Sequence, residues 1–168
     1  MRYLIQNKII SLGGSSTVRD EYDNDLYEVK GRIFSFTRFK TICSMEGEAL
    51  YKVRNKFFSL FLPKVYLMDA EGNRLLTIKK KSLFSFRQDF EIIPEPGVDW
   101  DLEIQGDILA WDFDVYNHGA RVAYIRRNLS LLRDSFSLEI TDDSNAPFYI
   151  ALVIALDNYY DKLRDDRN

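Results

Sequence analysis

The side chains best suited to nucleophilic or metal chemistry are few, because the 168 residues include one cysteine, Cys43, and one histidine, His118. A structural zinc site needs about four Cys or His ligands, so the sequence excludes one. A Ser-His-Asp triad would have to use His118, which lies in the turn sequence Asn117-His118-Gly119 and is expected to be solvated. Cys43 is expected to be a small buried side chain. Because the chain also lacks a Gly-x-x-x-x-Gly-Lys phosphate loop, we predict no catalytic residue, no metal site and no cofactor.

Carboxylates are concentrated in one stretch that contains neither Lys nor Arg. Its members are Asp99, Asp101, Glu103, Asp107, Asp112 and Asp114. Two of them could act as acid and base, or several could bind calcium weakly. However, no calcium-loop spacing is present, and the alternation in Trp111-Asp112-Phe113-Asp114-Val115 places both aspartates on the polar face of a strand. We therefore favour a solvated acidic face over a cation site, and a cation site over catalysis.

The basic residues give the better indication of function. Two clusters stand out: Lys52, Arg54, Lys56, Lys64, Arg74, Lys79, Lys80, Lys81 and Arg87 in the first, and Arg121, Arg126, Arg127 and Arg133 in the second. Each cation near an anionic membrane contributes about 1 kcal/mol, so four or more in one patch could hold a protein there. We take Lys52, Arg54, Lys79, Lys81, Arg126 and Arg127 as the candidate surface for an anionic ligand. The simpler interpretation is an ordinary polar face that balances the acidic stretch, with the neighbouring aromatics in the core.

Composition limits the classes of partner and location. The formal net charge is -3 and the sequence pI is about 5.3, whereas nucleic-acid binding needs a basic footprint. The longest apolar run, residues 146–156, is shorter than the roughly 20 residues that span a bilayer. Because the N-terminus also lacks a signal-peptide pattern, we expect a cytoplasmic protein without a transmembrane span, peripheral at a membrane only if the lipid hypothesis holds.

Most of the sequence alternates between apolar and polar residues with a period of two, which predicts that the elements positioning these side chains are β-strands. Short strands rich in Val, Ile, Phe, Tyr and Thr are predicted at 26–30, 49–54, 64–69, 74–80, 89–93, 100–105, 111–115, 121–126 and 135–141. Gly47, Gly72 and Gly119 are each followed by a similar segment, with apolar residues at the third and sixth places after the glycine and a cation at the seventh. We interpret the chain as two related halves, 26–92 and 101–164, although any set of β-hairpins shares part of this pattern.

A helix follows the last predicted strand, at about 146–164. Ser144-Asn145-Ala146-Pro147 supplies a cap and a first-turn proline, and the next residues are apolar on every side. A helix that is apolar all round must be buried all round. We therefore predict one domain over residues 1–168, mainly β: a closed antiparallel barrel of about 12 strands around a central hydrophobic C-terminal helix.

Several segments resemble the LURP-one-related proteins, which share a barrel with the C-terminal domain of tubby proteins and, more distantly, with phospholipid scramblases. The likeness rests on Tyr3-Leu4-Ile5-Gln6-Asn7-Lys8, Leu26-Tyr27-Glu28-Val29-Lys30-Gly31, Val65-Tyr66-Leu67-Met68-Asp69-Ala70-Glu71-Gly72, Asp134-Ser135-Phe136-Ser137-Leu138-Glu139-Ile140 and Ala151-Leu152-Val153-Ile154-Ala155-Leu156-Asp157. The resemblance implies the barrel fold. It implies little about function, since no tubby lipid-binding motif matches and the proline-rich arm and cysteine cluster of scramblases are absent.

Together these observations predict a non-enzymatic binding or scaffold module that docks an anionic phospholipid headgroup at its basic surface. The alternative is a protein–protein interaction or structural domain with a protein partner. An enzyme with a pocket at the barrel mouth ranks last, because no set of convergent titratable groups includes His or Cys.

Overall fold

Twelve β-strands and one long helix make up the part of the chain that the computed structural model describes, residues 1–6, 15–31, 37–56, 64–80, 90–107, 110–129 and 134–165. The strands are β1 (Arg2–Gln6), β2 (Ser15–Asp20), β3 (Asp25–Gly31), β4 (Lys40–Ser44), β5 (Ala49–Asn55), β6 (Lys64–Asp69), β7 (Arg74–Lys80), β8 (Phe90–Pro94), β9 (Leu102–Asp107), β10 (Asp112–Asn117), β11 (Ala120–Leu129) and β12 (Asp134–Ile140). A 3-10 turn, η2 (Asp143–Asn145), leads into α1 (Ala146–Asp165).

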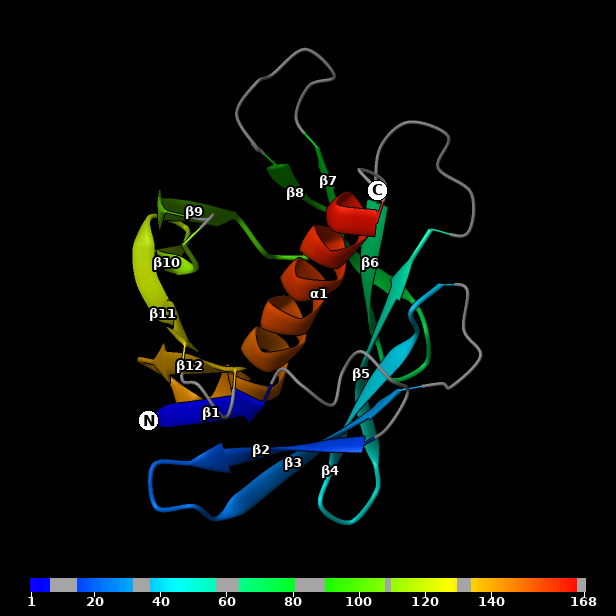
Figure 1. Ribbon diagram of the computed structural model, residues 1–168. Helices are drawn as coiled ribbons and strands as arrows, with labels where there is room; N and C mark the ends of the chain where they lie inside the picture. Colours follow the sequence, from blue (N-terminus) through cyan, green and yellow to red (C-terminus); the bar gives the residue numbers. More distant parts are fainter. Residues whose placement is uncertain are drawn as a thin grey trace.

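The strands form a single antiparallel sheet that curls into a nearly closed barrel around α1 (Figure 1). Their order is β8-β7-β6-β5-β4-β3-β2-β1-β12-β11-β10-β9, so every neighbour in the sheet is also a neighbour in sequence except the pair β1 and β12. That pair joins the first strand to the last, and the N-terminal amine of Met1 donates to the carbonyl of Ile140 at 3.0 Å. The predicted fold class, a β-barrel of about 12 strands with one C-terminal helix, is confirmed.

Four hairpins share one irregularity that follows from their turn chemistry. In each, one apolar residue shortly after the turn has no partner across the ladder: Leu26, Leu50, Leu75 and Val122. Three of the turns contain a glycine with positive φ, namely Gly47 at 89°, Gly72 at 99° and Gly119 at 74°. The extra residue forms a β-bulge, which increases the local twist that closure of a barrel requires. The glycine-centred repeat in the sequence therefore corresponds to a common hairpin geometry, while the relation between the two halves stays a prediction.

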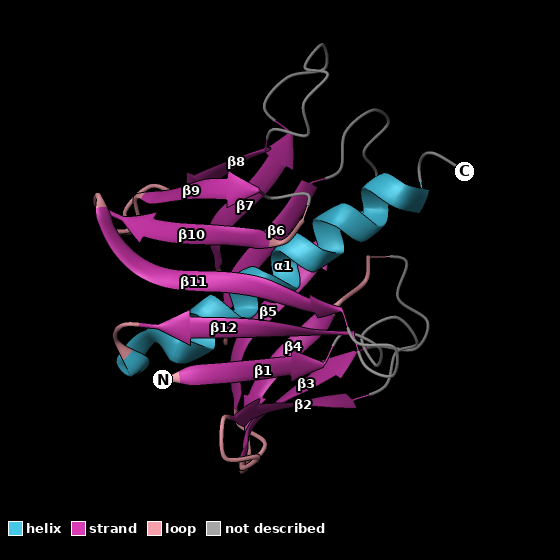
Figure 2. Cartoon of the chain, turned by 60° about the vertical axis from the view of Figure 1, so that its left-hand side comes forward, coloured by secondary structure: helices cyan, strands magenta, loops and turns pink. Residues whose placement is uncertain are grey.

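The helix occupies the barrel interior, as its apolar sequence predicts (Figure 2). From Ala146 to Leu156 every side chain except that of Pro147 is at most 3% exposed. The strands surround them with inward side chains that are also fully buried, among them Ile5, Val18, Ile42, Val53, Val65, Leu76, Ile78, Ile125 and Leu138. Near the start of the helix Trp100 stacks on Phe148, with ring centroids 3.9 Å apart and an interplanar angle of 3°. Burial of this whole apolar surface is the main stabilising term.

Two local features depart from the sequence pattern. Ser15 and Ser16 follow two glycines, as in a flexible turn, but they begin β2, and the two glycines lie outside the described residues. The residues from Asp157 onward are amphipathic and then charged, a pattern typical of a helix end that emerges into water. Instead Asp157 is 4% exposed and Asn158 and Tyr159 are fully buried, and the barrel supplies polar partners for Asp157 and Asn158. Lys40 Nζ lies 3.9 Å from Asp157 Oδ2.

Candidate functional site

Strand alternation places a set of basic side chains on the outside of β5, β6 and β7. On β5, Val53 and Asn55 face the helix and are buried, whereas Arg54 between them is exposed. On β6 and β7 the same rule turns Lys64, Tyr66 and Lys79 outward. We call the outward side chains Arg54, Lys64, Tyr66, Arg74 and Lys79 the basic face.

Tyr66 lies at the centre of the basic face and contacts two arginines. Arg54 is its direct partner across β5 and β6, and the guanidinium carbon Cζ of Arg54 lies 5.8 Å from the centre of the tyrosine ring. Arg74 lies closer to the ring, at 4.1 Å. Cation–π contacts of this kind hold guanidinium groups over an aromatic face without neutralising them. The face therefore has a fixed aromatic centre with positive charge on its sides.

The distribution of counter-ions among the described residues divides the basic face by strand: the cations on β7 are neutralised, whereas Arg54 on β5 and Lys64 on β6, which we call the uncompensated end, are not. Arg74 pairs with Glu95 at 3.2 Å and Lys79 pairs with Glu91 at 2.9 Å. Within the described residues no carboxylate lies within 4 Å of the Arg54 guanidinium or the Lys64 amine. Lys64 also stands directly opposite Lys79 in the β6–β7 register, and like charges opposite each other are destabilising. An anion bound at this end would relieve that repulsion.

The six residues of the candidate anionic-ligand surface are not brought together. Lys52 and Arg54 lie on β5 and Lys79 on β7, and the Lys52 amine donates to the Ala70 carbonyl. Arg126 and Arg127 lie on β11, which is six strand positions from β5 along the order β5-β4-β3-β2-β1-β12-β11 and thus on the opposite wall of the barrel. Lys81 lies outside the described residues. Arg54, Lys79 and Arg126 do share an outward position after equivalent hairpins, but Arg126 lies on the opposite wall from the other two.

Arg126 belongs to a local network with the acidic strand β10. The Arg126 guanidinium lies 3.5 Å from Asp112, which also accepts a hydrogen bond of 2.7 Å from the Tyr124 hydroxyl. Arg121 donates to Asp114 at 2.6 Å. Asp112 and Asp114 thus face outward as predicted, but they are half-buried and paired with β11. In the part of the chain that the structure describes, no three His, Cys, Asp or Glu side chains gather closely enough to hold a metal ion.

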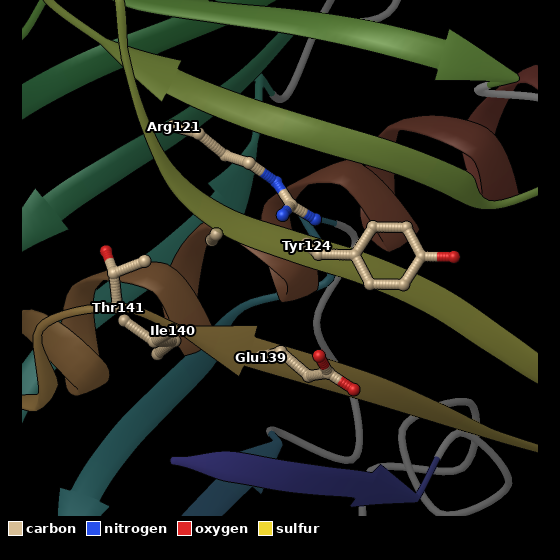
Figure 3. A pocket seen from close by; sticks show the side chains of 6 residues that line it. Arg121, Tyr124, Glu139, Ile140 and Thr141 are labelled. Atoms are coloured by element: carbon tan, nitrogen blue, oxygen red, sulfur yellow. The ribbon is translucent and has the colours of Figure 1, made fainter.

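A shallow cavity of about 150 Å³ lies over the outer faces of β11 and β12 (Figure 3). Its polar lining groups already have partners: Arg121 pairs with Asp114, and Glu139 pairs with the Arg2 guanidinium. Binding sites for drug-sized ligands usually measure about 300–1,000 Å³. A hollow of this size, whose charges are already satisfied, is a poor candidate for an active site.

The single cysteine and the single histidine lie where the sequence predicts. Cys43 is buried on β4, and burial raises the pKa of its thiol, which keeps it in the less reactive protonated form. His118 occupies the β10–β11 turn with a positive φ of 48° and an exposed ring. Its Nε2 lies 3.2 Å from the exposed carboxylate of Asp99. Neither residue lines the cavity over β11 and β12.

Comparison with known proteins assigns the family. The sequence model of the LURP-one-related family matches residues 1–157. The chain belongs to the LURP-one-related family. The Uncharacterized protein YxjI of Bacillus subtilis (strain 168) is similar to it, with 27% identity over 154 residues that cover 91% of this chain and 90% of that protein. An X-ray structure of a protein from Arabidopsis thaliana matches with a TM-score of 0.60 and 20% identity, over 94% of this chain and 90% of that one.

The LURP-one-related assignment establishes the fold and leaves the ligand open. The similarity to the Arabidopsis structure shows the shared barrel alone, at 20% identity. Within this LURP-one-related barrel, sequence reasoning missed the role of Tyr66 as a common partner of Arg54 and Arg74. The outward position of Tyr66 could have been predicted from the alternation in β6, but its neighbours depend on the register across β5, β6 and β7.

Proposed function

We propose that this LURP-one-related protein is a non-enzymatic binding module that docks an anionic phospholipid headgroup on its basic face. The observation that supports the proposal is the uncompensated end, where Arg54 and Lys64 flank Tyr66 and Lys64 faces Lys79 across the ladder. A phosphate group accepts hydrogen bonds from several cations at once, and the tyrosine ring offers an apolar contact beside them. Each such cation near an anionic surface contributes about 1 kcal/mol.

Binding in this mode keeps the protein outside the bilayer. Within the described residues no helix is long and apolar enough to cross a membrane. We therefore propose a cytoplasmic protein that is peripheral at the membrane through the basic face. On β11, Arg126 pairs with Asp112 and Arg121 pairs with Asp114, so these two arginines would contribute less to such binding.

The test is sedimentation of the full-length protein with vesicles of phosphatidylcholine alone and of phosphatidylcholine containing a phosphoinositide, at low and physiological ionic strength. We expect salt-sensitive binding to the anionic vesicles only. The double variant Arg54→Gln/Lys64→Gln should weaken that binding by about tenfold or more, since two cations of about 1 kcal/mol each are lost.

The matched control is Arg121→Gln/Arg126→Gln, which removes the same charge from arginines that are already paired with aspartates. Its binding should stay close to that of the wild type. Equal losses in both double variants would mean that net charge, and not the basic face, drives binding. Equal sedimentation with neutral and anionic vesicles, or with neither, would refute the proposal.

A further inference from the structure

The barrel wall is interrupted between β8 and β9, the two edge strands of the sheet (Figure 1). Among the described residues each pairs on one side only, β8 with β7 and β9 with β10. An edge strand presents unpaired backbone N–H and C=O groups, and these can accept an added strand from another chain. The two edges differ in how far they are protected from such pairing.

The hydrogen bonds of β9 identify which of its backbone groups face the opening. The His118 amide donates to the Asp101 carbonyl at 3.1 Å, so Asp101 is directed toward β10 and its turn. Backbone direction alternates along an antiparallel strand, so Glu103, Gln105 and Asp107 also bond to β10. The N–H and C=O groups of Leu102 and Ile104 therefore point to the free edge. Gly106, with a φ of 131°, ends the regular part of that edge.

The edge of β8 is protected in a way that β9 is not. The Glu95 amide donates to the Leu75 carbonyl at 2.9 Å, so by the same alternation Phe90, Ile92 and Pro94 face the opening. Pro94 has no N–H to offer, and proline is a usual means by which natural proteins block an edge. Strand β9 contains neither Pro nor Lys, so it is the more receptive of the two edges.

The side chains of β9 indicate the chemistry of an added strand. Asp101, Glu103 and Asp107 are exposed, and within the described residues no cation lies within 4 Å of them. On the neighbouring strand β10, by contrast, Asp112 and Asp114 receive their cations from β11. A strand added at the free edge would pair with β9 in the way that β11 pairs with β10. It would complete the pattern if it carried Lys or Arg on the outer face.

The opposite face of β9 is apolar. Leu102 and Ile104 turn inward and pack against the core while remaining half-buried. A segment that alternates basic and apolar residues would thus match both faces of β9, with its apolar side chains directed to the barrel interior. A second copy of this chain fits less well, because pairing two β9 edges would bring carboxylates together.

We propose that the free edge of β9 binds an extended basic segment of a partner protein by antiparallel strand addition. The backbone groups of Leu102 and Ile104 make the hydrogen bonds, and the carboxylates of Asp101, Glu103 and Asp107 pair with its Lys or Arg side chains. This site is separate from the basic face and does not depend on the lipid proposal.

The probe is a fluorescent ten-residue peptide of alternating Lys and Val, and binding to the full-length protein is followed by fluorescence anisotropy. Two further peptides carry N-methyl groups on alternate residues, one on the lysines and one on the valines. An added strand bonds through one edge only, so one pattern should abolish binding and the other should leave it within about twofold. A peptide with Glu in place of Lys should not bind.

Variants of the protein test the same site from its own side. Glu103→Lys/Asp107→Lys should weaken peptide binding by about tenfold at low salt, because two charge pairs become repulsive. The control Glu48→Lys/Glu71→Lys makes the same charge change in two exposed turns and should alter binding by about twofold at most. Equal binding of both N-methylated peptides, or equal loss in both double variants, would overturn strand addition at β9. Self-association of the wild type that Glu103→Lys abolishes would also overturn it, in favour of a second copy as the occupant.

Discussion

The two parts of α1 are buried to the same depth but differ in chemistry. From Ala146 to Leu156 the helix contacts apolar strand side chains, whereas Asp157 and Asn158 contact polar groups of the barrel. Lys40 of β4 pairs with Asp157. The Asn158 side-chain amide donates to the backbone carbonyl of Arg38 at 2.9 Å, and the Asn55 side-chain amide donates to the backbone carbonyl of Asn158 at 3.4 Å.

This difference separates two contributions to the fold. Apolar burial is favourable wherever the helix slides or rotates, so it provides stability with little directional information. A buried ion pair gains little net stability because both charges lose their water, but it is satisfied in one arrangement only. We infer that the polar part fixes the position of α1 relative to β4 and β5, while the apolar part holds it inside.

The largest effect is expected from a charge in the apolar part. Ile150→Asp would bury an unpaired carboxylate against side chains that are fully buried, at a cost of several kcal/mol. Leu152→Asp should act in the same way. Both variants should lose the cooperative melt followed by circular dichroism. The matched control is Ile93→Asp on β8, where the side chain is 36% exposed and the cost should stay near 1 kcal/mol. A cooperative melt in either helix variant would contradict the threaded barrel.

A smaller but still large effect is expected in the polar part. Lys40→Met leaves Asp157 buried without its lysine and should lower the free energy of unfolding by about 3–5 kcal/mol. The double variant Lys40→Met/Asp157→Leu removes both charges and should recover most of that loss, which denaturant titration of both proteins would measure. If the double variant were as unstable as the single one, the Lys40–Asp157 pair would contribute to the free energy of unfolding beyond the cancellation of its two charges.

The same contrast explains how far sequence reasoning reaches. The apolar run after Pro147 predicted the buried helix and hence the barrel, because an all-apolar helix has no stable position elsewhere in water. Lys40 could not be recognised as buried, since a lysine at the start of a short strand is normally solvated and its partner Asp157 is distant in sequence. Burial of such charges depends on tertiary pairing, which local periodicity does not encode.

The prediction of surface ion pairs from the sequence was limited in a similar way, because such pairs depend on the register between strands. Arg54, Lys79 and Arg126 occupy the cation place of the glycine-centred repeat, and all three face outward. That Arg126 stands opposite Asp112 depends on the bulge at Val122, which shifts the β10–β11 register by one residue. Which strands become edges was equally hidden, because it depends on how far the sheet closes.

The smallest effect at neutral pH is expected from the substitution Tyr159→Phe. Each part of the helix carries a buried tyrosine, so Tyr149 and Tyr159 allow the two parts to be compared. Burial raises the pKa of Tyr149, in the apolar part, and of Tyr159, beyond Asp157, each to about 12. The Tyr159 hydroxyl has no hydrogen-bond partner among the described residues. Tyr159→Phe should therefore change the free energy of unfolding at neutral pH by no more than about 1 kcal/mol, in either direction.

At alkaline pH the same substitution should have a clear effect. A tyrosine whose pKa is raised in the folded state contributes stability that is complete below pH 10 and is lost as the pH rises from about 10 to about 12. The loss amounts to about 2–3 kcal/mol for each tyrosine shifted by about two units. Denaturant titrations across this range should show a shallower decline for Tyr159→Phe and for Tyr149→Phe than for the wild type. If only Tyr149→Phe flattened the decline, the surroundings of Tyr159 would have to be open to water, and the polar part of α1 would be less buried than the apolar part.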